Sequence, residues 1–173
     1  MNSDSHWVLP EDHPRALNDA IGTVAINSSY LEMALENAIN SMVMFHGDVT
    51  SGGPSLGDLI IRLDKELKGS PYSQREDFNE WAELRSRMRH LKDERDHIIH
   101  AGSWLSLEGD AKLTAFRRNS NANKRSRRLS VSQIRRTAIE LKNAAADVLN
   151  LIWNLEAAET GMPRQPKRNG DVY

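Results

Sequence analysis

Apolar residues recur every three or four positions along most of this chain, which is the spacing of one face of an amphipathic α-helix. The pattern predicts four helices, at about 14–45, 55–68, 73–100 and 132–158. Pro14 suits the first turn of the first helix. The connections between the helices are short and rich in turn-forming residues. The predicted fold class is therefore all-α, an up-and-down bundle of four main helices.

A different pattern stands before the last helix. Apolar and polar residues at 104–116, around the turn Glu108-Gly109-Asp110, predict a small β-hairpin inserted into the bundle. The polar segment 116–128 that follows is predicted to be a loop, so the hairpin and the basic loop together occupy about 104–130. Two short strands are too few to define the fold.

The chain of 173 residues is long enough for one domain with a proper core. We expect residues 13–159 to form this single domain, 1–12 to be a flexible leader and 160–173 to be a disordered tail. No stretch approaches the roughly 18 apolar residues that a membrane span needs. The expected setting is the cytoplasm, with no membrane partner.

Composition removes several kinds of chemistry. There is no cysteine, which excludes disulfides, thiolate catalysis and cysteine-ligated zinc. The net charge of −1 argues against a globally basic nucleic-acid binder, so any such surface must be a local patch. The sequence contains no phosphate-binding glycine motif and no nucleophile elbow, and no cofactor is expected.

One residue interrupts the apolar stripe of the third predicted helix. The heptad positions 81, 84, 88, 91, 95, 98 and 102 hold Trp, Leu, Met, Leu, Arg, Ile and Gly, and only Arg95 does not suit a packed seam. Burying its guanidinium is costly unless oxygen atoms satisfy it. Either Glu32 or Glu36 of the first helix pairs with it, or it faces a cleft and binds a phosphate.

Two neighbours strengthen the second interpretation. Asp96 and His100 are four residues apart, so on a helix the carboxylate can orient the imidazole for acid–base chemistry. Arg95 lies about 140° around the helix from His100, which presents the two side chains poorly to one small ligand. The helix could loosen at its end, or the long arginine could wrap around it. We favour a symmetric dimer that completes the site across its interface.

The stretch Arg95-Asp96-x-x-x-His100, which closes a helix and precedes Ala101-Gly102, resembles the motif of the HEPN superfamily (higher eukaryotes and prokaryotes nucleotide-binding). The resemblance covers about 14–158 in architecture and implies a helical bundle that commonly dimerises. It also implies a metal-independent endoribonuclease that leaves a 2′,3′-cyclic phosphate. His100 would be the general acid or base, Arg95 would stabilise the phosphorane charge, and Asp96 would orient or polarise the site.

The resemblance further implies a toxin or antiphage defence effector, with an antitoxin or defence-system protein as a possible partner. Some toxins of the superfamily carry a modified tyrosine two residues after the histidine, whereas this chain has Gly102. Non-catalytic members also exist. The alternative function is therefore a protein- or nucleotide-binding module without turnover.

A basic cluster follows the motif, and we expect it to bind the RNA backbone. It contains no acidic residue and consists of Arg117, Arg118, Lys124, Arg125, Arg127 and Arg128. A hydrated loop is the alternative interpretation.

Histidines and carboxylates at 90, 93, 94 and 97 have the spacing of a metal site on one helical face. A solvated polar face explains them better, so no metal is expected.

Overall fold

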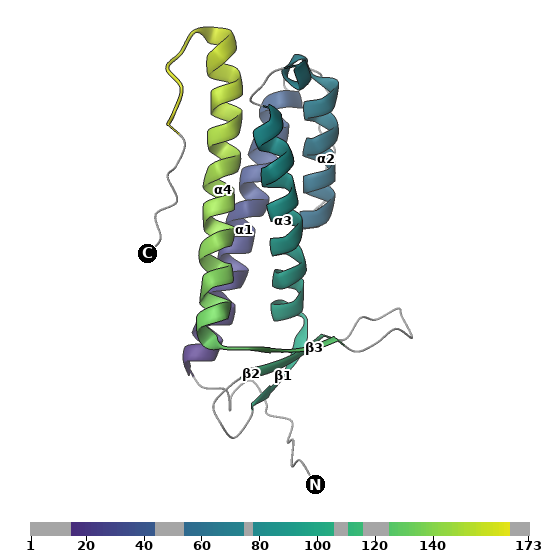
Figure 1. The fold of residues 1–173 in the computed structure, drawn as a ribbon, viewed down its shortest axis with the longest axis vertical. Coiled ribbons are helices and arrows are strands. Elements are labelled where there is room, and N and C mark those ends of the chain that lie inside the picture. Colours follow the sequence, from purple (N-terminus) through teal and green to yellow (C-terminus); the bar gives the residue numbers. More distant parts are fainter. Residues whose placement is uncertain (1–14, 44–53, 75–77, 106–110, 116–124, 167–173) are drawn as a thin grey trace.

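The computed structural model describes residues 15–43, 54–74, 78–105, 111–115 and 125–166 (Figure 1). Most of them belong to four long helices. These are α1 (Arg15–Val43), α2 (Leu56–Gly69), α3 (Phe78–Ile99) and α4 (Val131–Thr160), with a short 3₁₀ helix η2 (Pro71–Gln74) between α2 and α3. The prediction of a mainly helical chain with four helices is confirmed. The predicted leader at 1–12 lies outside the described residues.

The helices do not alternate in direction as an up-and-down bundle requires. α3 runs against α2 and α4, whereas α1, α2 and α4 run the same way (Figure 1). The Asn27 amide in the middle of α1 donates a hydrogen bond of 2.8 Å to the Ala138 carbonyl in the first third of α4. The up-and-down prediction is therefore wrong for the step from α1 to α2.

The length of the connection explains this difference. Residues 44–55 separate α1 from α2, and twelve residues can span about 40 Å when extended. That is longer than α2 itself, whose 14 residues rise by about 21 Å. Such a connection can return the chain along the bundle, which a short helix–helix turn cannot do.

Each helix contributes one apolar stripe to a single core. Leu31, Leu63, Met88 and Leu141, one from each helix, are at most 1% exposed. Burying a side chain of this size contributes about 1.5–3 kcal/mol. α2 and α4 begin at serine capping boxes, in which the Ser55 and Ser130 hydroxyls accept hydrogen bonds from the backbone of the first turn.

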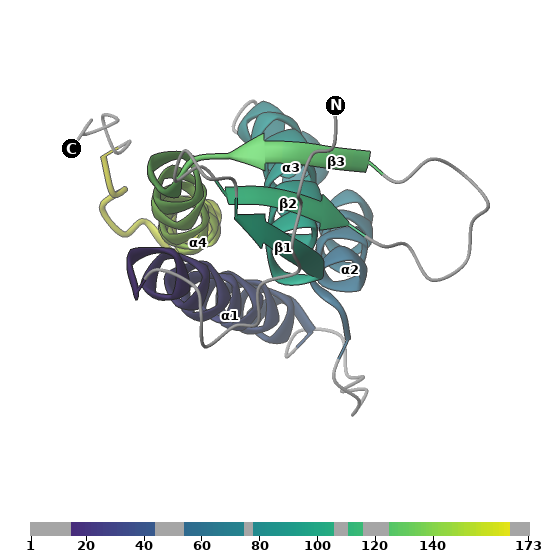
Figure 2. The ribbon, with the colours of Figure 1, turned by 90° about the horizontal axis from the view of Figure 1, so that it is seen from below.

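A three-stranded antiparallel sheet lies across the end of the bundle where α3 ends and α4 begins (Figures 1 and 2). Its strands are β1 (Ala101–Leu105), β2 (Ala111–Ala115) and β3 (Arg125–Leu129), in the order β1-β2-β3. β1 and β2 pair where the sequence predicts a hairpin. The loop prediction for 116–128 is wrong at 125–128, because pairing with β2 satisfies the backbone of this charged segment at the sheet edge.

The chain turns back after α4. Gly161 adopts a left-handed conformation with φ of 70°, which ends the helix. The following residues run along α4, where Gln165 exchanges two hydrogen bonds with the Asn154 side chain, of 2.8 and 3.1 Å. This is the described part of the segment predicted to be a disordered tail, and 167–173 lie outside the described residues. Among the described helices, none combines the length and apolar character needed to cross a membrane.

Candidate functional site

The seam predicted on the third helix is present in α3. Its apolar heptad residues are buried, namely Trp81, Leu84, Met88, Leu91 and Ile98. Arg95 interrupts this stripe with a side chain that is 23% exposed. Gly102, the last heptad position, belongs to β1 because α3 ends at Ile99. The question is therefore what satisfies a largely buried guanidinium.

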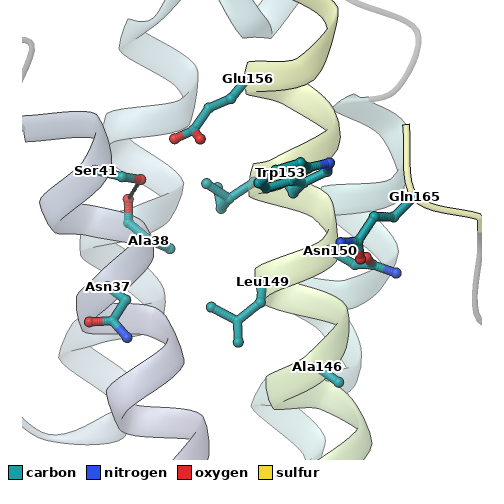
Figure 3. A pocket seen from close by; sticks show the side chains of 10 residues that line it. Asn37, Ala38, Ser41, Ala146, Leu149, Asn150, Trp153, Glu156 and Gln165 are labelled. Atoms are coloured by element: carbon teal, nitrogen blue, oxygen red, sulfur yellow. Dashed lines mark hydrogen bonds between the residues drawn. The ribbon is translucent and has the colours of Figure 1, made fainter. Parts of the chain in front are cut away.

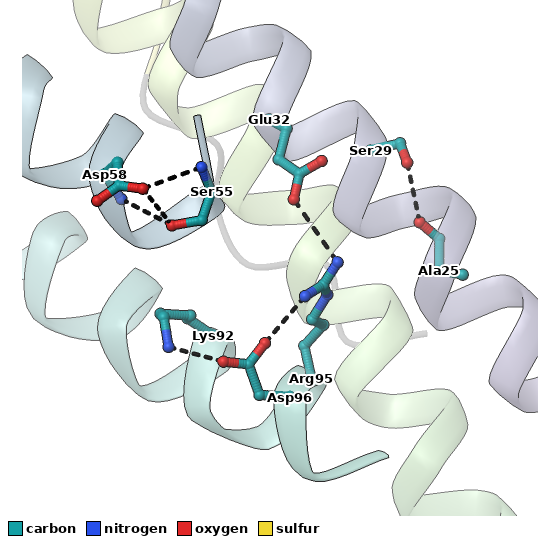
Figure 4. Close-up of polar contacts among 8 residues, drawn as sticks. All are labelled: Ala25, Ser29, Glu32, Ser55, Asp58, Lys92, Arg95 and Asp96. Atoms are coloured by element: carbon teal, nitrogen blue, oxygen red, sulfur yellow. Dashed lines mark hydrogen bonds and ion pairs between the residues drawn. The ribbon is translucent and has the colours of Figure 1, made fainter. Parts of the chain in front are cut away.

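Two carboxylates contact the Arg95 guanidinium (Figure 4). Its Nη1 donates a hydrogen bond of 2.9 Å to Asp96 Oδ1, and its Nη2 lies 3.7 Å from Glu32 Oε1 of α1. Of the two glutamates considered from the sequence, Glu32 is the one that reaches across. The Nε atom is buried and has no hydrogen-bond partner among the described residues. Two nitrogens of the guanidinium thus contact carboxylates, and the third has no described hydrogen-bond acceptor.

Asp96 links this arginine to a second cation. Lys92 Nζ donates a hydrogen bond of 2.7 Å to Asp96 Oδ2 (Figure 4). Burial raises the pKa of Asp96, but the hydrogen bonds and charges of Lys92 and Arg95 outweigh that effect and hold the pKa below its usual value. The carboxylate is therefore the ionised centre of a polar cluster, which we define as Glu32, Lys92, Arg95 and Asp96.

Lys92 also lies against the beginning of α2. A Cβ atom on Gly57 would stand 3.0 Å from Lys92 Cε, so a glycine leaves room for the lysine. Hydrogen bonds from the Ser55 side chain and backbone lower the pKa of Asp58, with a smaller contribution from the Lys92 charge. The polar cluster therefore joins three helices: α1 through Glu32, α2 through its first turn, and α3.

His100 directly follows α3, and its backbone N–H donates a hydrogen bond of 3.1 Å to the Asp96 carbonyl. Its side chain is exposed. In the part of the chain that the structure describes, no hydrogen bond joins the imidazole to the Asp96 carboxylate, which instead contacts Lys92 and Arg95. The structure thus brings Arg95 and Asp96 into contact and leaves the His100 ring open to solvent at the same end of α3.

The basic cluster is only partly described. Arg125, Arg127 and Arg128 belong to β3, and the other three predicted RNA-binding residues, Arg117, Arg118 and Lys124, lie outside the described residues. β1 begins one residue after His100, and β3 is two strands away in the sheet. Neighbouring strands are about 4.8 Å apart, so the backbone of β3 lies about 10 Å from that of β1. The arginine-containing strand and the motif share one end of the bundle.

The histidines of α3 do not gather metal ligands. The His90 side chain is 71% exposed, and its Nε2 lies 3.8 Å from Glu94 Oε1. The other Glu94 oxygen accepts a hydrogen bond of 3.0 Å from the Thr137 hydroxyl of α4. Within the described ranges, no three histidine, aspartate or glutamate side chains are placed to hold one metal ion.

Two grooves lie elsewhere on the described surface, and sequence reasoning found neither. One, of about 510 Å³, runs between α1 and α4 beside Leu149 and Trp153 (Figure 3). The other, of about 460 Å³, lies between α3 and α4, where Arg87 pairs with Asp147. Neither groove contains Arg95. For the groove between α1 and α4, the available signal was the pair of apolar residues Leu149 and Trp153, which lie off the stripe of α4 that forms the core.

A scan of protein-family models, a search of curated proteins and a search of solved structures each find no match to this chain.

Proposed function

We propose that this protein is a metal-independent endoribonuclease of the HEPN type, acting as a toxin or antiphage defence effector in the cytoplasm. The observation that carries the proposal is the common location of the Arg95–His100 motif and the arginine-containing strand β3 at one end of the bundle. A phosphate-binding track next to an acid–base histidine is what cleavage of an RNA backbone requires.

In this proposal His100 moves the proton. Its exposed ring follows the last turn of α3, where an RNA 2′-hydroxyl or leaving oxygen can approach it. An imidazole has the pKa range suited to either step near neutral pH. The 2′-oxygen attacks the adjacent phosphorus, the bond to the 5′-oxygen breaks, and the products are a cyclic phosphate and a free 5′-hydroxyl. The proton taken from the 2′-hydroxyl is balanced by one given to the leaving oxygen.

Arg95 binds the phosphate. Its contact between Nη2 and Glu32 Oε1 spans 3.7 Å, which is long for a charged pair. A phosphate that accepts two parallel hydrogen bonds from the guanidinium therefore competes well with Glu32. Asp96, which touches the arginine and not the imidazole, becomes a positioning residue for Arg95.

The test is cleavage of mixed RNA in EDTA by wild type, His100→Ala and Arg95→Ala. His90→Ala is the matched control, because it removes an exposed imidazole from the same helix. We expect both motif variants to lose cleavage by about 10²-fold or more, and the control to keep it. Products should end in cyclic phosphate. Equal cleavage by wild type and His100→Ala would place the activity elsewhere or in a contaminant.

The polar cluster also favours a second function, that of a non-catalytic protein- or nucleotide-binding module. Glu32 and Asp96 already hold Arg95, as they would if its role were to join α1 to α3. This alternative predicts no cleavage by a well-folded wild type.

A further inference from the structure

The residues that follow α4 cross the surface of this helix. Trp153 Nε1, beside the groove between α1 and α4, donates a hydrogen bond of 3.3 Å to the Pro163 carbonyl. Gln165 then exchanges its two hydrogen bonds with the side chain of Asn154, which lines the groove between α3 and α4. The segment 162–166 therefore passes from the α1 side of α4 toward its α3 side.

The last described contact of this segment shows where the chain continues. Asn150, which lines both grooves, donates a hydrogen bond of 3.4 Å to the Pro166 carbonyl. Because Asn150 lies four residues before Asn154, the segment moves about 6 Å toward the start of α4 between these two contacts. Each residue after Pro166 can add at most about 3.6 Å. Residues 167 and 168 therefore begin at the rim of the groove between α3 and α4.

This groove is negatively charged. Its lining holds three carboxylates, of Glu80, Glu83 and Asp147, and one guanidinium, that of Arg87, which pairs with Asp147. The lining therefore carries an excess of two negative charges around a volume of about 460 Å³. The two residues that directly follow Pro166 in the sequence are a lysine and an arginine, so their charge matches this excess.

We propose that Lys167 and Arg168 bind in the groove between α3 and α4, so that the segment after α4 fastens α4 to α3. Charges within a groove are less screened by water than charges on an open surface, which strengthens their attraction. Asn150 and Asn154 already hold the preceding backbone, so ordering two more residues costs little.

The tether selects this segment over a basic segment of another protein. A group attached next to its binding site has an effective concentration in the millimolar range, which a separate molecule rarely reaches. The last described carbonyl, that of Pro166, already contacts Asn150 of the groove lining. The chain's own cations therefore occupy the groove first.

This contact is separate from the proposed ribonuclease. Glu83 lies 12 residues before Arg95 on α3, which is about 18 Å along the helix. Substitutions in the groove should therefore leave RNA cleavage unchanged. Each of the two proposals can fail while the other holds.

Limited digestion of the full chain with trypsin tests the contact, because Lys167 and Arg168 are cleavage sites that binding protects. We expect Glu83→Gln to raise the rate of cleavage after these two residues at least about threefold. Glu36→Gln is the matched control, since it removes the same charge from an exposed side chain on α1. Mass spectrometry identifies the bonds that are cut. Equal rates in wild type and Glu83→Gln would overturn the proposal and leave the groove open to a second molecule.

A charge exchange gives an independent readout, the melting temperature followed by circular dichroism. A variant with both Lys167→Glu and Arg168→Glu should melt about 1–3 °C below wild type, and so should Glu83→Lys. Combining the three substitutions should recover about half of the summed loss, because opposite charges then meet again.

Lys142→Glu is the control for this exchange, because Lys142 is an exposed cation of α4 outside the groove lining. Its effect on the melting temperature should simply add to that of Glu83→Lys. Equally additive losses for the substitutions at 167 and 168 would contradict the pairing.

Discussion

The polar cluster around Arg95 and the outer face of α1 and α4 are opposites in how they meet solvent. In the cluster, the Asp96 carboxylate contacts Lys92 and Arg95, and Arg95 also contacts Glu32, over distances of 2.7–3.7 Å. The outer face consists of six apolar residues that are between 41% and 58% exposed, namely Ile26, Tyr30 and Met33 of α1 and Ile139, Leu149 and Trp153 of α4. The charged residue in the apolar stripe draws attention to the cluster in the sequence, and in the fold most of its polar atoms have partners. The outer face does not stand out in the sequence, and in the fold its apolar side chains remain exposed to solvent.

The difference separates two kinds of functional signal. A charge in an apolar seam has a high desolvation cost, so the fold supplies partners for it whether or not it also acts on a ligand. Exposed apolar side chains need few partners within the chain, although Trp153 Nε1 donates a hydrogen bond of 3.3 Å to the Pro163 carbonyl. Residues of the cluster should therefore contribute to the stability of a single chain, and residues of the outer face should contribute little to it.

The largest contrast is expected between two tryptophans. Trp81 is 1% exposed, and its Nε1 donates a hydrogen bond of 2.8 Å to Asp64. Trp81→Ala should lower the free energy of unfolding by about 3–5 kcal/mol, through the cavity it leaves. Trp153→Ala should lower it by less than about 1 kcal/mol. Urea denaturation at low protein concentration, followed by circular dichroism, measures both values.

Protein concentration sharpens the same contrast. Association through the outer face would make the deficit of Trp153→Ala grow as the concentration rises, because a dimer is stabilised by mass action. We expect neither deficit to change, since the dimer expected from the sequence forms at the Arg95–His100 motif and not on the outer face. A Trp153 deficit of several kcal/mol in the dilute monomer would show that the outer face belongs to the fold, and the comparison would fail.

A smaller effect is expected from the cluster. Glu32→Ala leaves Arg95, which is 23% exposed, with Asp96 as its remaining described partner. The expected loss is about 1–2 kcal/mol, between the values for exposed and fully buried ion pairs. Glu36→Ala, on the exposed side of α1, is the matched control and should change stability little. Equal losses of unfolding free energy in the two variants would show that the Glu32–Arg95 contact does not stabilise the fold.

The helical part of the fold was largely predictable because each helix carries its own periodic stripe. The capped helix α2 begins at Leu56 after Ser55, close to the predicted start at 55. Direction was not predictable in this way, since periodicity within a helix says nothing about its neighbour. The error at α1 and α2 came from treating the connection at 44–55 as a short turn.

For the site, sequence spacing located Arg95 and named Glu32 as a candidate partner, and the contact of 3.7 Å agrees. Spacing also suggested that Asp96 orients His100, since four residues on a helix are neighbours. Spacing alone could not choose between His100 and Lys92, which is also four residues from Asp96 and is the residue that binds it. The outer face was not predicted because, in the sequence, apolar residues beside the core stripe of a helix cannot be distinguished from residues of a wider core stripe.

The finest distinction between the two regions is their response to acid. Asp96 has a pKa below the ordinary 3.8, because the hydrogen bonds and charges of Lys92 and Arg95 outweigh the opposite effect of burial. A lowered folded-state pKa gives stability that is fully present above the unfolded value and is lost as the pH falls through the folded value. Asp96→Asn should therefore lose less stability than wild type between pH 5 and strongly acidic buffer, a difference that melting curves measure.

Asp93→Asn is the control for this experiment, since it removes the same charge from a side chain on α3 that is 72% exposed. Asp64, whose pKa is also lowered because contacts from Lys68, Trp81 and Arg85 outweigh burial, retains its own acid sensitivity in every variant. The expected signal is thus a reduction and not an abolition of the pH dependence. An equal reduction in Asp93→Asn would mean that the pH dependence follows the total charge of the chain. The polar cluster would then contribute as little to the free energy of unfolding as the outer face does.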